Sequence, residues 1–197
     1  MSKEIKTPEQ SAVKQKVDLD PRFIGKLTLT LFSICAVVAL LLGIVNSVTE
    51  PIIRKMQEER TAAAMAQVLQ ADEYVPVELT GENVKAVYKA VTAGEQIGFV
   101  VEVTTNGFGG AISMVVGVDM TGKVTGVSVT ADKETANVGT KVTKNPAVLD
   151  RFIGLGGVIA VNGGENRFDA ISGATVSSKA VAAGVNAALA AVAASGK

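Results

Sequence analysis

An uncharged apolar run close to the N-terminus is the strongest pattern in the chain. Residues 27–48 read LTLTLFSICAVVALLLGIVNSV and include no charged side chain. As a helix, this run is about 33 Å long, enough to cross the hydrocarbon core of a bilayer. The pattern therefore predicts a membrane-spanning helix over residues 27–48.

Three other kinds of segment contain an apolar run near an N-terminus. A buried globular helix is usually shorter, and a cleaved signal peptide has a shorter apolar region followed by a small-x-small site. The run ends instead in Asn46-Ser-Val-Thr-Glu50-Pro51, without Ala-x-Ala. A prepilin junction at residues 25–30 would require an acidic residue where Thr30 stands. We expect an uncleaved anchor.

The pattern after the apolar run predicts one helix and then a sheet. Residues 51–69 are rich in helix formers and begin with a proline, so residues 49–75 are assigned to a connecting helix. Alternating apolar and polar positions then predict a strand at residues 84–90. Three further strands follow, separated by a turn at 93–96, a glycine-rich connection at 106–110 and a turn near 119–122. The strands are expected at residues 84–90, 97–105, 111–118 and 124–130. Their short connections predict an antiparallel meander.

The C-terminal third predicts helices that pack against this sheet. A short helix is expected at residues 145–152 and a short strand at 158–161. Residues 175–194 are nearly all Ala and Val, which predicts a helix buried on the sheet. A second membrane span is the alternative, against which Lys179 and Asn186 argue. The fold class is α+β, with a compact domain at residues 76–197.

Charges flank the apolar run on both sides and weakly orient it. Basic residues precede it at Lys14, Lys16, Arg22 and Lys26 and follow it at Arg54, Lys55 and Arg60. The slight excess of basic residues on the N-terminal side favours a cytoplasmic tail at residues 1–26. Because this tail is short, we expect the domain on the outer face of the cell membrane.

The composition excludes several classes of function. The formal net charge is zero and no basic patch with interleaved aromatics is present, which argues against nucleic-acid binding. The chain has no histidine and one cysteine, Cys35. An internal disulfide and histidine-based nucleophilic catalysis are therefore excluded, and no metal site is predicted. Demanding chemistry in this chain would need an organic cofactor.

Three segments combine residues that could bind a ligand, and each has a structural alternative. Asn106-Gly-Phe-Gly-Gly110 allows close approach of a ligand but also suits an ordinary hairpin. Asp132-Lys-Glu-Thr-Ala-Asn-Val-Gly-Thr-Lys141 gathers charged and hydroxyl groups after a strand, as a solvated loop with a helix cap also does. Ser172-Gly-Ala-Thr175 begins the last helix, where an anion is favoured, although Ser172 or Thr175 could simply cap that helix.

These three segments, in this order and after an N-terminal membrane anchor, are similar to those of a known protein family. The chain resembles the FMN-binding G subunit of the Rnf electron-transport complex and is similar to the C subunit of the sodium-translocating NADH:quinone reductase. The likeness rests on Gly107-Phe-Gly-Gly110, the strand with Met114-Val-Val-Gly117, the Lys-Glu-Thr segment and Ser-Gly-Ala-Thr at the last helix. The family commonly has Glu-Thr-Pro-Gly-Leu-Gly where this chain has Glu134-Thr-Ala-Asn-Val-Gly139, and often a histidine where Asp132 stands.

The resemblance implies a covalent FMN, joined through its phosphate to Thr175 by a flavin transferase. Asp169 would then serve recognition by the transferase or a metal ion during modification. Phe108 is a candidate for contact with the ring or for the core. The other residues expected near the cofactor are Ser172, Gly173, Ala174, Glu134, Thr135 and Gly109.

The resemblance also implies a function. The chain would carry electrons as one component of a membrane complex that couples electron transfer from reduced ferredoxin to NAD⁺ with Na⁺ or H⁺ translocation. Its partners would be the other Rnf subunits, the transferase and the lipid bilayer, and it would not complete the reaction alone. The corresponding component of the quinone reductase and an anchored binding or assembly domain without redox function are the alternatives.

Overall fold

The computed structural model describes residues 21–78, 81–164 and 166–195, which divide into two compact units between Ile52 and Ile53. The described part of the first unit is helical and belongs to α1 (Pro21–Val68). Within α1, an 18-residue window has a mean hydropathy of 2.6 and none of it is buried. The predicted span at residues 27–48 lies inside this helix.

The second unit contains a five-stranded antiparallel sheet with the strand order β1-β2-β3-β4-β5. Each strand pairs with its neighbour in sequence, so the predicted meander is confirmed. The strands are β1 (Glu73–Val77), β2 (Val84–Thr92), β3 (Glu95–Asn106), β4 (Ala111–Asp119) and β5 (Val124–Asp132).

The start of the sheet differs from the prediction. The connecting helix was expected to reach residue 75, but α1 ends at Val68 and β1 begins at Glu73. The sheet therefore begins before residue 76. The turn expected at 93–96 is also shorter, because only Ala93 and Gly94 have positive φ angles, of 53° and 83°, and the next residue already belongs to β3.

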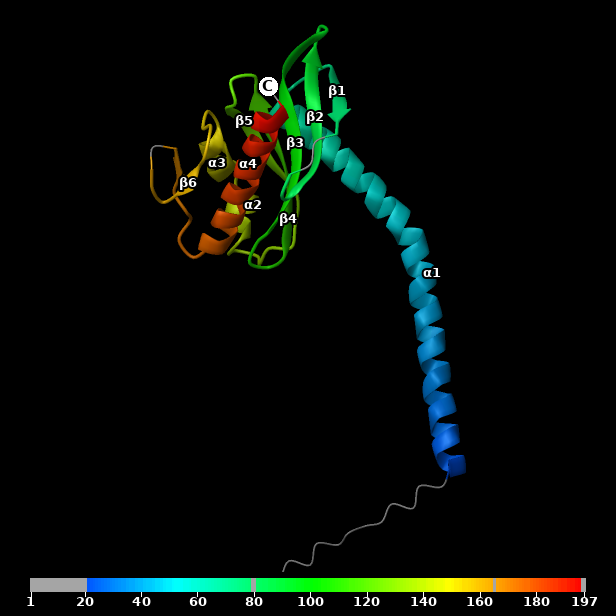
Figure 1. Cartoon of the computed structure of the whole chain (residues 1–197). Coiled ribbons are helices and arrows are strands. Elements are labelled where there is room, and N and C mark those ends of the chain that lie inside the picture. The colour runs from blue at the N-terminus through cyan, green and yellow to red at the C-terminus, as the bar shows by residue number, and fades with distance from the viewer. Residues whose placement is uncertain (1–20, 79–80, 165, 196–197) are drawn as a thin grey trace, which may run out of the picture. The chain divides into compact units, whose positions relative to one another are not determined.

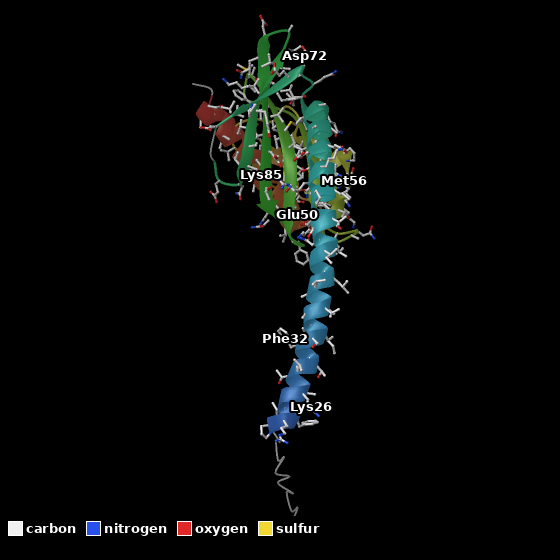
Figure 2. The ribbon with its side chains drawn as sticks, turned by 90° about the vertical axis from the view of Figure 1, so that its right-hand side faces the viewer. Lys26, Phe32, Glu50, Met56, Asp72 and Lys85 are labelled. Carbon is white, nitrogen blue, oxygen red and sulfur yellow. The ribbon has the colours of Figure 1, made fainter. Side chains whose placement is uncertain are left out.

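The two faces of the sheet carry separate cores. On one face packs α4 (Thr175–Ser195), whose Val181, Val185 and Ala188 are fully buried (Figure 1). On the other face, Ala64 and Met65 near the end of α1 pack against the sheet (Figure 2). Helix α4 is long and apolar enough to span a membrane, but 61% of its apolar window is buried in this domain. It is a core helix, as the sequence favoured.

Short elements connect β5 to α4. They are α2 (Thr140–Thr143), α3 (Pro146–Leu149), η1 (Asp150–Phe152), β6 (Ala160–Val161) and β7 (Arg167–Phe168). The helix expected at 145–152 is divided into α3 and η1, and the strand expected at 158–161 is reduced to β6. Helix α2 and strand β7 were not anticipated. The rings of Phe152 and Phe168 stack with centroids 4.2 Å apart and join η1 to β7.

The turn between β4 and β5 is organised by Asp119. Its Oδ1 accepts hydrogen bonds from the Thr121 amide at 2.8 Å, the Thr121 hydroxyl at 2.7 Å and the Lys123 amide at 2.9 Å. Partial burial disfavours the charged form, but the hydrogen bonds from Lys123 and Thr121 together outweigh it and lower the pKa of Asp119 below 3.8. A lowered pKa in the folded state stabilises the fold above the unfolded pKa and loses that effect as the pH falls through the folded value.

We therefore expect Asp119→Ala to reduce the free energy of unfolding by about 1 kcal/mol at neutral pH, the scale of lost hydrogen bonds at an exposed turn. The difference in stability between Asp119→Ala and the wild type should shrink as the pH falls below 3.8, because the wild-type carboxylate then becomes protonated. Thermal unfolding of the full chain in detergent, measured across this pH range, checks both the size and the sign. A difference that grows at acid pH would contradict the assignment.

Candidate functional site

The carboxylate of Glu134 brings together the three segments that the sequence singles out. Glu134 follows β5, and only 9% of its surface is exposed. Its Oε1 accepts hydrogen bonds from the backbone amides of Phe108 at 2.8 Å and Gly109 at 3.5 Å. Its Oε2 accepts a hydrogen bond from the Ser177 hydroxyl at 2.9 Å. One side chain therefore links the β3–β4 loop, the segment after β5 and the first turn of α4, which lie at the same end of the domain (Figure 1).

Glycines make this convergence possible. A Cβ atom at Gly107 or Gly139 would overlap the carboxylate oxygens of Glu134. A Cβ at Gly109 would overlap the carbonyl oxygen of Lys133 and lie 3.0 Å from the Cα of Glu134. Glycine is therefore required at these positions by close packing against Glu134 and the backbone before it.

Thr175 is the first residue of α4 and its side chain is exposed. The preceding turn places Gly173 at φ +77° and is closed by a hydrogen bond from the Ala174 amide to the Ile171 carbonyl at 2.9 Å. The Ser178 hydroxyl accepts a hydrogen bond from the Ile171 amide at 3.1 Å. Within the described residues, neither Ser172 nor Thr175 makes a side-chain hydrogen bond. The structure thus leaves both hydroxyls accessible and gives neither one a capping role.

A cavity of about 280 Å³ opens beside Thr175. Phe108 and Val138 line it from one side, and residues 173–177 line it from the start of α4. Phe108 is 67% exposed, so it does not belong to the core of the domain. The cavity combines apolar side chains with a free hydroxyl and the amide groups of a helix N-terminus, where negative charge is favoured.

A larger cavity of about 740 Å³ lies at the other end of α4, where Leu189 and Val192 contribute to its wall. Leu189 is fourteen residues after Thr175, or about 21 Å along the helix. This larger cavity contains none of the three segments. The cavity beside Thr175 is therefore the better candidate, although it is smaller.

The turn after Glu134 explains one departure from the family pattern. Asn137 stands where the family commonly has glycine, and its φ angle is 61°. Asparagine tolerates this left-handed conformation better than other residues with a side chain. The backbone amide of Asn137 also donates a hydrogen bond to the Thr140 hydroxyl at 2.9 Å. The turn is therefore kept without the family's glycine and proline.

We expect Asn137→Gly to leave the melting temperature within about one degree of the wild type, because glycine adopts the same conformation. Asn137→Val should cost about 1–2 kcal/mol, because a β-branched residue is strained in the left-handed region. Thermal unfolding of both variants checks this pair. Equal stability of the two would show that the conformation at Asn137 is not constrained.

Other residues expected at the site lie near it without a resolved role. Thr135 is exposed and its carbonyl accepts a hydrogen bond from the Val138 amide at 3.1 Å, closing the turn. Asp169 is exposed and forms an ion pair with Arg167, with Nε and Oδ1 3.5 Å apart. Among the described residues, no group of three His, Cys, Asp or Glu side chains could hold a metal ion. Ser177 lies in the stretch that the sequence singles out at residues 172–178, but no separate role is predicted for it, because its only signal is a hydroxyl two positions after Thr175.

Comparison with known proteins identifies the class of this domain. The model of the FMN-binding domain family matches residues 107–190, which include the second and third segments and all of the first except Asn106. A solved structure of the C subunit of the Na⁺-translocating NADH-quinone reductase from Parabacteroides distasonis is similar in fold, with a TM-score of 0.52 and 18% identity. The match covers 70% of this chain and 92% of that chain. The chain is an FMN-binding domain protein with an N-terminal apolar helix.

Relatives of similar length define the family more narrowly. The G subunit of the Na⁺-translocating ferredoxin:NAD⁺ oxidoreductase complex of Acetobacterium woodii is 33% identical, covering 88% of this chain and 93% of the relative. The G subunit of the ion-translocating oxidoreductase complex of Methanosarcina acetivorans is 34% identical, covering 82% of this chain and 90% of the relative. The chain belongs to the family of the G subunits of Rnf-type ion-translocating oxidoreductase complexes.

Proposed function

We propose that this chain is the electron-carrying G subunit of a membrane-bound, ion-translocating ferredoxin:NAD⁺ oxidoreductase, with FMN joined through its phosphate to Thr175. The observation that carries the proposal is the free hydroxyl of Thr175, at the first residue of α4 and in the wall of the cavity with Phe108. The family of the chain and the match to the FMN-binding domain support the cofactor and the complex.

The residues around Thr175 suit such a group. A phosphodiester keeps its negative charge, which the amide groups at the start of α4 stabilise by roughly 0.3–1 kcal/mol. Gly173 has open space where a Cβ would lie, so a phosphate can approach its backbone. Ser172 offers a second hydroxyl. Phe108 and Val138 provide an apolar wall for the flavin ring.

The cavity is small for a whole flavin nucleotide. Pockets that enclose a drug-sized ligand usually measure about 300–1,000 Å³, compared with about 280 Å³ here. The ring would therefore remain partly exposed, which suits a group that exchanges electrons with partner subunits. Bound FMN supplies the redox chemistry, because it takes up and releases one or two electrons.

Attachment requires a flavin transferase and an activated donor. A bond forms between the Thr175 Oγ and the phosphorus of FMN, the anhydride bond of a dinucleotide such as FAD breaks, and the nucleotide monophosphate leaves. The hydroxyl proton passes to a general base on the transferase. Thr135, Gly109 and the exposed Asp169 are assigned to the cofactor or transferase contacts on the resemblance alone.

The anchor places this chemistry at a membrane. We assign residues 27–48 to the bilayer, residues 1–26 to the cytoplasmic side and the domain from residue 76 to the outer face, on the charge distribution described above. Because covalent FMN cannot dissociate, a domain outside the cell would keep its cofactor. The other subunits supply the ferredoxin and NAD⁺ sites and the ion path, so this chain alone is not a complete enzyme.

Expression of the chain together with a flavin transferase tests the proposal. The full chain, expressed together with the transferase and separated on a denaturing gel, should fluoresce under ultraviolet light. Its intact mass should increase by one FMN residue. A band without fluorescence and an unmodified mass would refute the covalent cofactor and favour an anchored binding domain.

A further inference from the structure

We infer that Glu134 and Ser177 form a positioning pair, which sets the first turn of α4 so that the hydroxyl of Thr175 is presented for flavin attachment. The inference rests on the proposed attachment at Thr175. It gives Glu134 a different role from a direct flavin contact, because both of its oxygens already accept hydrogen bonds from the protein.

The pair is buried at the centre of the site. Ser177 is 1% exposed and Glu134 is 9% exposed, and the hydroxyl of Ser177 donates to Glu134 Oε2 at 2.9 Å. Hydrogen bonds to an ionised carboxylate are roughly twice as strong as those between neutral groups. A buried carboxylate with several such donors therefore holds its neighbours in one arrangement.

Helix geometry shows how this bond acts on Thr175. Successive residues of an α-helix are turned by about 100°, so Ser177 and Thr175 lie about 200° apart around the axis. When Ser177 points inward to Glu134, Thr175 must point outward. The burial pattern agrees, with Thr175 and Val176 exposed and Ser177 and Ser178 buried. The bond therefore fixes the rotation of the first turn of α4, where few backbone hydrogen bonds constrain it.

The other oxygen of Glu134 fixes the opposite wall of the cavity. Its bond to the Phe108 amide holds the β3–β4 loop against the segment after β5, and Phe108 lines the cavity with Thr175. Gly107 and Gly139 pack closely against the same carboxylate, and a Cβ at either position would overlap its oxygens. One side chain thus sets the distance between the apolar wall and the modified hydroxyl.

Kinetics of modification in vitro test the pair. The full chain is purified in detergent without flavin, and the initial rate of attachment is measured with a flavin transferase and FAD over a range of chain concentrations. We expect Ser177→Ala and Glu134→Gln each to lower kcat by about tenfold, the effect of losing a hydrogen bond to a charged group. The KM for the chain should change less than about twofold, because the exposed surface around Thr175 is unchanged.

Two further variants separate positioning from stability. The double variant Glu134→Gln/Ser177→Ala should be no slower than the slower single variant, because both remove the same interaction. Ser113→Ala removes a serine hydroxyl that lies 3.2 Å from the Thr104 hydroxyl, outside the cavity, and should leave the rate unchanged. Melting curves recorded for each variant ensure that rates are compared where every chain is folded.

The outcomes distinguish this inference from the proposed function. If the wild-type chain accepts no FMN, the proposed attachment fails. If the wild type is modified and the folded single variants are modified at the same rate, the positioning role fails while the attachment stands. A decrease that follows only the folded fraction, or additive losses in the double variant, also overturns the positioning pair.

Discussion

Replacing Thr175 by alanine is expected to abolish the covalent flavin and leave the fold intact. The side chain is exposed and makes no hydrogen bond within the described residues, so its loss breaks no hydrogen bond of the fold. Alanine is also the strongest helix former, and the first turn of α4 should keep its shape. Fluorescence on a denaturing gel should fall to background, while the melting temperature of the apoprotein shifts by no more than about two degrees, as is usual for exposed positions.

Thr175→Ser is the matched control because it keeps a hydroxyl at the same place. The Thr175→Ser chain should still become fluorescent. Its rate of flavin attachment depends on how well the transferase tolerates the loss of the methyl group. Lys179→Ala changes an exposed residue of the same helix outside the cavity and should be modified like the wild type. A fluorescent Thr175→Ala chain would show that the flavin is attached elsewhere.

Gly109→Ala is expected to damage the site through the backbone. The new Cβ would overlap the Lys133 carbonyl oxygen, and that oxygen cannot move without displacing Glu134. We expect a loss of about 1–3 kcal/mol, typical of overpacking in a tight region, and a fall in the melting temperature of about 2–4 °C per kcal/mol, as is usual for a domain of about 150 residues. The rate of flavin attachment should fall as well, because the β3–β4 loop carries Phe108.

Gly163→Ala is the control for this substitution. Gly163 lies in a loop with nothing within 4 Å of the position of a Cβ, so alanine should change neither stability nor modification. Melting curves and attachment rates for the two glycine variants, recorded side by side, decide the question. If Gly109→Ala behaves like Gly163→Ala, the close packing around Glu134 does not constrain the loop.

The sequence predicted the larger elements of the fold for clear physical reasons. Strands β2 to β5 are nine to twelve residues long and rich in apolar residues, and α4 is a 21-residue helix made mostly of Ala and Val. Short elements lack such a signal. Strand β1 (EYVPV) is five residues long and contains Pro76, while β7 has two residues and α2 forms a single turn. Their positions are decided by tertiary pairing, which local pattern does not encode.

The site was predictable in its parts but not in its assembly. The glycine-rich loop, the Glu134 segment and the start of α4 were each identified from residue types. The bond between Glu134 and Ser177, which are 43 positions apart, follows only from the fold. Val138 and Val176 were not assigned to the site because apolar residues carry no chemical signature in a sequence. The structure places both of them in the cavity wall.

The most direct test of the central claim is to locate the flavin on the chain. Trypsin cleaves after Arg167 and Lys179 and releases FDAISGATVSSK, which contains Ser172, Thr175, Ser177 and Ser178 as possible acceptors. Fragmentation of this peptide from chain expressed with the transferase should place a single FMN phosphodiester on Thr175. An adduct on one of the serines, or on any other peptide, would contradict the account.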